Sequence, residues 1–501
     1  MKNNKIRRQP TFGESIFSFL IMFFFVFVGY MILGLRIELM MIAAAAGAGI
    51  LAWRIGYTWT DMESAITQRL ISATPAILII WVIGIVIATF IFSGSIPMLI
   101  FYGIQIVHSE YLLISAFLLC LLFSIVTGTS WGSVGTVGVA FMSISEGLGV
   151  PLHITAGAVI SGAIFGDKMS PLSETTNLAA ATAGANLYEH IKSMTWTTVP
   201  AGIITFIVFL FVGNVVGTSN EGSSVSSIQM LDGLDNIFTW SPLLLIPFIV
   251  ILIGAIMKKP PVPTMLLGSL TAIILGVASQ GFSLQSATTA AFSGFDVTMI
   301  PNINTETLSE GVLTLVNRGG IMSMVTVVII IYCGYAYTAI ISKAGFLETA
   351  LNPLYNRVRK RGPLMITTLF TEFVILFLSG TSYTVAIMIP EMFKKAFLKA
   401  GMPAKTLSRS IEDVGTMLAP FIPWGTSGAF YISTLGVTPF GSGGYAVWTI
   451  MAYVTPIIAI ILAFTGIGLY KMSQEESKRA LQNYRATNSV MTKSTNTVNQ
   501  A

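Results

Sequence analysis

The chain has 501 residues, of which 54% are hydrophobic and only 10% are charged. Soluble domains usually contain about 25% charged residues, so this composition excludes an ordinary soluble enzyme or binding module and favours one integral membrane domain. The formal net charge of +5 does not indicate nucleic acid binding, because the basic residues are scattered at loop ends and are not clustered with aromatic residues. We expect them to orient the chain in the bilayer.

The first half of the chain, residues 1–217, is expected to form one membrane repeat. A helix needs about 20 apolar residues to cross a bilayer. The segments 111–126 and 131–147 are shorter than this and are joined by the polar turn Thr127–Ser130, so they are expected to form a re-entrant hairpin. In chain order, the predicted elements are spans at 15–34, 37–53 and 71–92, with an amphipathic stretch at 54–70, an interfacial segment at 95–107, the hairpin at 111–147, a helix at 153–190 that is broken at 167–177, and a span at 197–217.

The second half, residues 241–470, repeats this order. Its predicted elements are spans at 241–257, 264–279 and 320–341, a hairpin at 363–400, a broken helix at 404–434 and a span at 446–470. Residues 218–240 are expected to be an external linker, and the polar residues 471–501 a cytoplasmic, disordered tail. The expected fold class is an all-α polytopic membrane protein with about ten transmembrane helices, two re-entrant hairpins and two broken helices, arranged as two inverted-topology repeats.

One sequence pattern occurs in both halves, 252 residues apart. The residues that recur at this offset are Gly128, Thr129, Ser130, Gly149, Pro151 and Pro171, whose counterparts are Gly380, Thr381, Ser382, Gly401, Pro403 and Pro423. Both copies lie within long apolar stretches, where interrupted backbone is costly because no water satisfies it. A duplicated interruption of membrane helices indicates the binding site of a transporter.

The charge distribution agrees with an inverted second half. Five crossings and one hairpin in each half form an odd number of crossings, so the second half must enter the membrane upside down. If the N-terminus is cytoplasmic, the predicted inner segments hold 24 of the 27 Lys and Arg residues, whereas the outer segments hold only Arg36 and Arg318. These inner segments are 1–14, 54–70, 186–196, 258–263, 342–362, 394–409 and 471–501. The positive-inside rule predicts this bias, and both termini are expected in the cytoplasm.

The broken helices offer chemistry suited to an ion. An interrupted helix frees carbonyl and amide groups at membrane depth, and the hydroxyls beside each break add further oxygen ligands. Oxygen ligands suit hard cations such as Na⁺. Helix N-termini that point at the same place would instead favour an anion. The pattern therefore allows a cation, an anion or both.

Carboxylates near the breaks favour a cation. Asp167 and Glu174 flank the first break, Glu412 and Asp413 lie near the second, and Glu372 lies in the first leg of the second hairpin. Ionisable groups inside a bilayer are costly and usually functional. One carboxylate can hold either a proton or a metal cation but not both, which is the simplest basis for cation/proton exchange. Asp167 is the first choice for the exchanging acid, followed by Glu412 and Asp413, and then Glu372.

These arguments define a set of candidate residues. The ion- or substrate-binding candidates are Thr127, Gly128, Thr129, Ser130, Asp167, Lys168, Ser173, Glu174, Thr175, Thr176, Asn177, Glu372, Gly380, Thr381, Ser382, Glu412, Asp413, Thr426 and Ser427. A Na⁺ ion is expected at Asp167, Thr129, Ser130, Thr176 and Asn177.

Structural roles for some of these residues remain open. Asp167 and Lys168 could form an ion pair that stabilises the break, and Glu412 could pair with Arg409. The hydroxyls at the hairpin tips could cap half-helices. The pattern G-x-S-x-G at Gly128–Gly132 matches a hydrolase nucleophile elbow, but a long apolar helix precedes it where that motif needs a strand. No nucleotide-binding or zinc motif occurs, so we expect no enzyme activity and no cofactor.

Two stretches resemble a known family. The sequences TGTSWGSVGTV at 127–137 and SGAIFGDKMSPLSETTNLA at 161–179 closely resemble the NhaC family of bacterial Na⁺/H⁺ antiporters, within the ion-transporter superfamily. The resemblance implies a secondary antiporter of the cytoplasmic membrane that exchanges cytoplasmic Na⁺ for external H⁺ and forms a homodimer. The family includes relatives that exchange malate and protons for lactate and Na⁺, so a Na⁺-coupled organic-acid exchanger that also binds small carboxylates is the alternative.

Overall fold

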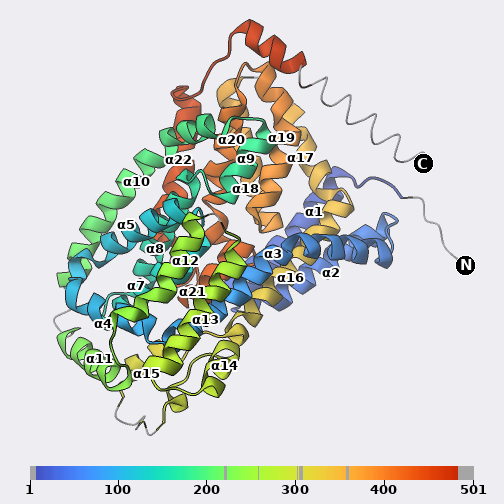
Figure 1. Ribbon diagram of the computed structural model, residues 1–501. Helices are drawn as coiled ribbons and strands as arrows, with labels where there is room; N and C mark the ends of the chain where they lie inside the picture. The colour runs from blue at the N-terminus through green and yellow to red at the C-terminus, as the bar shows by residue number, and fades with distance from the viewer. Residues whose placement is uncertain are drawn as a thin grey trace, which may run out of the picture.

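The computed structural model describes residues 7–218, 223–257, 259–301, 303, 308–356, 360–482 and 484. All regular secondary structure in these residues is helical (Figure 1). Among them, eight helices are long and apolar enough to cross a membrane, or nine when the bent pair Ile228–Ile237 and Pro242–Gly254 is counted as one span. These findings confirm an all-α polytopic membrane protein.

The helices of the first half follow the predicted order. They are α1 (Phe12–Phe23) with its π-helical continuation η1 (Phe24–Ile32), α2 (Ile37–Arg54), α3 (Trp59–Phe92), α4 (Ser95–Ile106), η2 (Ser109–Tyr111), α5 (Leu112–Thr127), α6 (Ser130–Ser133), the π-helical η3 (Val134–Gly138), α7 (Val139–Gly147), α8 (Leu152–Met169), α9 (Glu174–Ala183) and α10 (Leu187–Thr218).

The second half contains more short elements. They are α11 (Ser223–Ile237), η4 (Pro242–Leu245), α12 (Ile246–Ile256), α13 (Pro261–Ser279), α14 (Leu284–Ser293), η5 (Val297–Met299), α15 (Glu310–Val316), η7 (Ile321–Met324), α16 (Val325–Lys343), α17 (Phe346–Asn356), α18 (Arg361–Ser379), α19 (Ser382–Lys399), α20 (Ala404–Ile411), the π-helical η8 (Glu412–Thr416), η9 (Ala419–Phe421), α21 (Thr426–Leu435), η10 (Ala446–Trp448) and α22 (Ile450–Thr465).

Several elements differ from their predicted bounds. The predicted span at 241–257 contains only the 11-residue helix α12 after a 3₁₀ turn that starts at Pro242. The predicted span at 446–470 contains the 16-residue helix α22, which ends where Gly466 turns left-handed. Conversely, the first hairpin leg is longer than predicted, because Ser109–Thr127 forms 19 residues with the composition of a membrane span. The predicted linker contains α11, and the start of the predicted disordered tail is helical at 474–482.

The first break is also shorter than predicted. Helix α8 continues to Met169 and α9 begins at Glu174, so the interruption covers residues 170–173 and not 167–177. Ser173 caps α9 by accepting a hydrogen bond from the main-chain N–H of Thr176. This cap restarts the helix directly after Pro171, and a polar residue in that position is a strong helix-start signal.

The two stretches that share the repeated pattern have the same turn geometry. Gly128 and Gly380 both adopt left-handed conformations with φ of 70° and 67°, which a residue without a Cβ adopts at little cost. The following Thr129 and Thr381 are both extended, with φ of −148° and −147°, and each caps the helix that follows. Polar and glycine residues inside the apolar runs therefore produce a tight helix–turn–helix in each half, between α5 and α6 and between α18 and α19.

Each hairpin tip packs against the break that follows it in the chain. A Cβ on Gly128 would lie 2.6 Å from the Cβ of Leu172, and a Cβ on Gly380 would lie 2.9 Å from the Cα of Gly425. The main-chain N–H of Thr426 donates to the carbonyl of Gly380 at 3.0 Å. Tip and break are thus in direct contact through backbone atoms in both halves.

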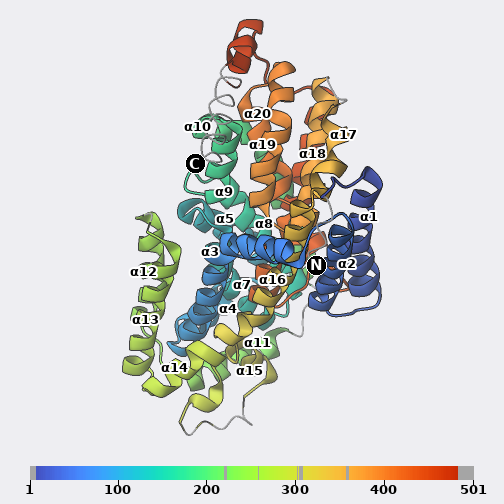
Figure 2. The same cartoon turned by 90° about the vertical axis from the view of Figure 1, so that its right-hand side faces the viewer.

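The other helices surround the two hairpin tips and breaks at both ends of the molecule and on two opposite sides. In Figure 1, α9, α18, α19 and α20 lie toward one end of the molecule, and α4, α7, α11 and α15 lie toward the other. In Figure 2, the pair α12 and α13 and the pair α1 and α2 flank the centre on opposite sides. Large apolar side chains are exposed on these outer helices, for example Leu20, Ile42, Ile253 and Ile274, as expected for surfaces that face lipid.

Candidate functional site

A cavity of about 460 Å³ lies where both hairpin tips and both breaks meet. Its walls come from α3, the tip between α5 and α6, the end of α8, the break before α9, the start of α19, the segment from η8 to α21, and α12 with the start of α13. The repeated pattern therefore forms one cavity from segments about 250 residues apart in the chain.

More than half of the predicted site residues line this cavity. They are Thr127, Gly128, Thr129, Ser130, Asp167, Ser173, Glu174, Thr175, Ser382, Thr426 and Ser427. The predicted residues outside its lining are Lys168, Thr176, Asn177, Glu372, Gly380, Thr381, Glu412 and Asp413. The sequence interpretation missed Thr416, Tyr383 and Tyr431, which also line it. Helical spacing could have found two of these, since Thr416 follows Glu412 by one turn and Tyr431 follows Ser427 by one turn.

Asp167 is the buried carboxylate of this cavity. Its side chain is only 7% exposed, and its Oδ2 accepts a hydrogen bond of 2.8 Å from the Oγ of Ser130 at the first hairpin tip. A carboxylate has about four lone-pair sites, so Asp167 can accept from Ser130 and still bind a ligand in the cavity. Glu174 supplies a second carboxylate, and Lys259 is the one basic side chain among the described lining residues.

Four helices begin at the cavity wall. Residues in the first turns of α6, α9, α19 and α21 all contribute to the lining. The hydroxyls of Thr129, Ser173 and Thr381 accept hydrogen bonds from main-chain N–H groups in these first turns. The capping role left open for the tip hydroxyls is thus confirmed for Thr129 and Thr381, and Ser173 has the same role at the first break. Helix N-termini carry a partial positive charge, which here offsets the charge of the cavity's carboxylates.

Thr176 and Asn177 stabilise the first break. The Thr176 hydroxyl donates to the carbonyl of Lys168 at 3.1 Å. The Asn177 amide donates to the carbonyls of Pro171 and Ser173 at 2.9 and 2.7 Å. Both side chains thus bond to backbone carbonyls at the interruption, and neither is part of the cavity lining.

A second polar group is buried beside the cavity, between α8, α10 and η8. The Lys168 Nζ lies 2.6 Å from the Oδ1 of Asp413, and both side chains are fully buried. The Thr197 hydroxyl on α10 donates to the same oxygen at 2.6 Å. The Nε of Arg409 lies 3.7 Å from the Oδ2 of Asp413. Lys168 therefore pairs with Asp413, 245 residues away in the chain, and not with Asp167.

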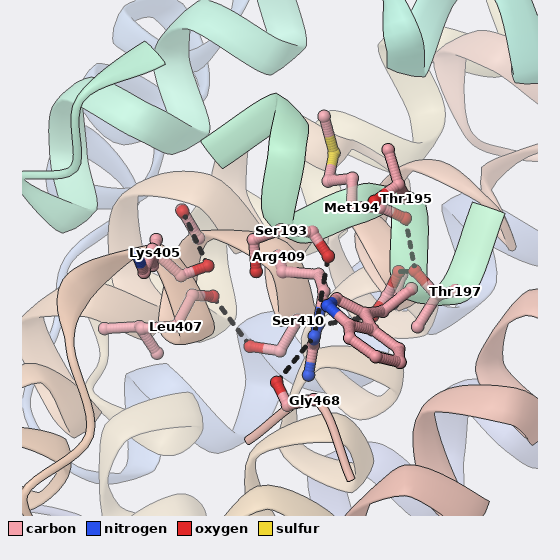
Figure 3. Close-up of polar contacts among 12 residues, drawn as sticks. Ser193, Met194, Thr195, Thr197, Lys405, Leu407, Arg409, Ser410 and Gly468 are labelled. Atoms are coloured by element: carbon pink, nitrogen blue, oxygen red, sulfur yellow. Dashed lines mark hydrogen bonds and ion pairs between the residues drawn. The ribbon is translucent and has the colours of Figure 1, made fainter. Parts of the chain in front are cut away.

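Arg409 is held by main-chain carbonyls as well as by this carboxylate. Figure 3 shows its side chain between Ser193 and Gly468, whose carbonyls accept hydrogen bonds of 3.5 and 3.0 Å from its Nη1. The ion pair that the sequence left open between Glu412 and Arg409 does not form, because Arg409 pairs with Asp413.

In the described part of the chain, no group of three or more His, Cys, Asp or Glu side chains could hold a metal ion.

Comparison with known proteins identifies the kind of molecule that contains this cavity. Residues 102–176 and 162–467 match the model of the Na⁺/H⁺ antiporter family. The chain belongs to the Na⁺/H⁺ antiporter family. The antiporter is therefore a transport protein and not an enzyme, and the resemblance to antiporters that its sequence suggested is confirmed.

Curated relatives match the antiporter over nearly its whole length. A Na⁺/H⁺ antiporter of Haemophilus influenzae is 38% identical over 95% of this chain and 100% of its own. The Na⁺/H⁺ antiporter NhaC of Alkalihalophilus pseudofirmus is 34% identical over 95% and 100%. The malate-2H⁺/Na⁺-lactate antiporter of Bacillus subtilis is 32% identical over 92% and 96%.

Proposed function

We propose that the antiporter exchanges cytoplasmic Na⁺ for external H⁺ at the cavity lined by Asp167. The observation that carries this proposal is a buried carboxylate, held by Ser130, at the point where the hairpin tips and breaks meet. A carboxylate oxygen together with hydroxyl and carbonyl oxygens is a suitable ligand set for a hard cation. The relatives named Na⁺/H⁺ antiporters support the same cargo.

We further propose that the ligands of Na⁺ are the Asp167 carboxylate, the Ser130 hydroxyl and the backbone oxygens of the Thr127–Ser130 tip. Thr176 and Asn177, which were expected as ligands, are better assigned to the structure of the break. Na⁺ and H⁺ are cargo in this scheme, and no cofactor takes part.

The proposed architecture has two inverted repeats, residues 1–217 and 241–470, with ten crossings and two re-entrant hairpins. The matching geometry at Gly128 and Gly380 supports a repeat, and the distribution of Lys and Arg supports the inversion. We propose that both termini face the cytoplasm of a bacterial cell and that the protein acts in the cytoplasmic membrane as a homodimer.

A Na⁺-coupled exchange of organic acids is the second candidate. Its support is the size and polarity of the cavity. The volume of about 460 Å³ lies within the roughly 300–1,000 Å³ of small-molecule sites, so a small dicarboxylate has room. The first turns of four helices and Lys259 at the wall would attract an anion. One relative carries malate and lactate in its name.

Proton flux in everted membrane vesicles separates the two candidates. Addition of Na⁺ alone should move protons in the first case, whereas the second requires malate or lactate as well. The variant Asp167→Asn should insert normally and lose Na⁺-dependent flux, while Glu391→Gln, which removes an exposed acid on α19, should remain active. Normal exchange by Asp167→Asn would remove this residue from the binding site.

A further inference from the structure

Glu372 is a buried acid outside the cavity. It lies on α18 and is fully buried. Its Oε1 accepts one hydrogen bond, of 2.9 Å, from the Ser410 hydroxyl on α20. Its Oε2 has no hydrogen-bond partner. Burial of a carboxylate with an unused oxygen is unusual, because each such group normally has its hydrogen bonds satisfied.

The basic groups near Glu372 are bound elsewhere. Lys168 and Arg409 both pair with Asp413, and no described Lys, Arg or His side chain lies within ion-pair distance of Glu372. The charged groups that act on Glu372 are Asp413 and Glu412 on η8 and Lys168 on α8. Two of these three are acids, so an ionised Glu372 would be an unpaired charge among like charges.

We propose that Glu372 binds the transported proton at a site separate from the Na⁺ cavity. This inference rests on the proposed Na⁺/H⁺ exchange and adds a second site to it. In the conformation described, Glu372 is a neutral carboxylic acid: a proton bonds to one oxygen, the negative charge disappears, and no cation is needed in the pocket around it. Release is the reverse step, in which the O–H bond breaks, the proton leaves to water and the carboxylate is restored.

The proton and Na⁺ then influence each other through charge without sharing an oxygen. Glu412 on η8 interacts electrostatically with both Glu372 and Asp167. A negative Glu372 strengthens the attraction of this region for Na⁺, and a neutral Glu372 weakens it. By linkage, bound Na⁺ must oppose proton binding at Glu372 to the same degree.

Two modes of transport distinguish a separate proton site from competition at Asp167. The full-length protein in liposomes is tested for exchange of labelled Na⁺ against unlabelled Na⁺, which needs only the Na⁺ site, and for Na⁺ flux driven by a pH gradient, which needs both. Glu372→Gln, which mimics the protonated acid, should keep Na⁺/Na⁺ exchange within about twofold at saturating Na⁺ and lose at least about tenfold of the proton-driven flux. Asp167→Asn should lose both modes, and Glu391→Gln should keep both.

The outcomes separate this inference from the proposed function. If the wild-type protein shows neither mode, the proposed function itself is wrong. If Glu372→Gln loses both modes, or keeps full proton-driven flux, the separate proton site is wrong. If Glu372→Gln does not fold, Ser410→Ala is tested instead; it removes the hydroxyl that bonds to Glu372 and to the carbonyl of Leu407. It should shift the pH of half-maximal exchange by about one unit with Na⁺/Na⁺ exchange unchanged, and an unshifted profile would overturn the inference.

Discussion

Replacing Lys168 by Met removes the cation from a fully buried ion pair without removing the bulk of the side chain. In the native protein the Nζ of Lys168 lies 2.6 Å from Asp413, and neither side chain is exposed. The substitution leaves Asp413 with the Thr197 hydroxyl and with Arg409 at 3.7 Å. The opposite change, Asp413→Leu, leaves two buried cations without their carboxylate.

The magnitudes follow from what each change leaves unpaired. Breaking a buried ion pair by removing one partner costs about 3–5 kcal/mol. Lys168→Met belongs at the lower end, about 3 kcal/mol, because Arg409 still neutralises Asp413. Asp413→Leu belongs at the upper end, about 5 kcal/mol. Thr197→Val, which removes one hydrogen bond to a charged group, should cost about 2 kcal/mol. The double variant Lys168→Met/Asp413→Leu should cost less than the sum of its parts, because the two residues interact directly.

Reversible unfolding in mixed detergent micelles, followed by circular dichroism, gives the free energies of unfolding for the four variants. The free energy of unfolding should fall least in Thr197→Val, more in Lys168→Met and most in Asp413→Leu. A Lys168→Met protein within 1 kcal/mol or so of the wild type, or an additive double variant, would show that this pair behaves like a solvated surface pair and would refute the reasoning.

Three further predictions follow from other parts of the molecule. Gly128→Ala should lower the thermal stability more than Gly436→Ala, because both glycines have φ near +70° but only the first Cβ would meet other atoms; equal losses would show that backbone strain alone matters. The pKa of Glu476 is lowered by a hydrogen bond from the main-chain N–H of Ser473. Its contribution to the helix at 474–482 is therefore present above the unfolded-state pKa of about 4.5 and is lost as the pH falls below that value. Amide hydrogen exchange in this helix, corrected for the intrinsic effect of pH, should rise below this pH in the wild type, and the variant Glu476→Gln should show no such rise. An impermeant thiol reagent should label Arg36→Cys from outside intact cells and Lys192→Cys only after permeabilisation; the reverse pattern would invert the proposed orientation.

The hairpin tips could be predicted because their signals are local. A glycine followed by hydroxyl residues inside an apolar run is enough to predict the turn at Gly128 and its repeat at Gly380, and Asp167 lies close enough in the pattern to be expected at the same place. The bounds of α12 and α22 were harder to predict, because a 3₁₀ turn that starts at Pro242 precedes α12 and Gly466 ends α22, and composition alone shows neither change.

The pairing of charges could not be predicted from the sequence. Lys168 has an acid beside it at Asp167, so a neighbouring ion pair was a reasonable expectation. In the structure, Lys168 forms its ion pair with Asp413, and Asp167 accepts a hydrogen bond from Ser130. This choice depends on how α8 lies against η8, and no local periodicity contains that information. The same holds for Glu372, whose distance from the cavity is set by packing between α18 and α20.

The contact between each hairpin tip and its break has a consequence for how the cargo reaches water. In the second half, a Cβ would not fit between Gly380 and Gly425, and the main-chain N–H of Thr426 donates to the carbonyl of Gly380. Separating this tip from its break would leave these backbone groups unpaired, which is costly inside a bilayer. We therefore expect loading and release to depend on the other helices that line the cavity, such as α3, α12 and α13. Substitutions that change which ion is chosen and substitutions that change how fast it is delivered should consequently map to different elements of the chain.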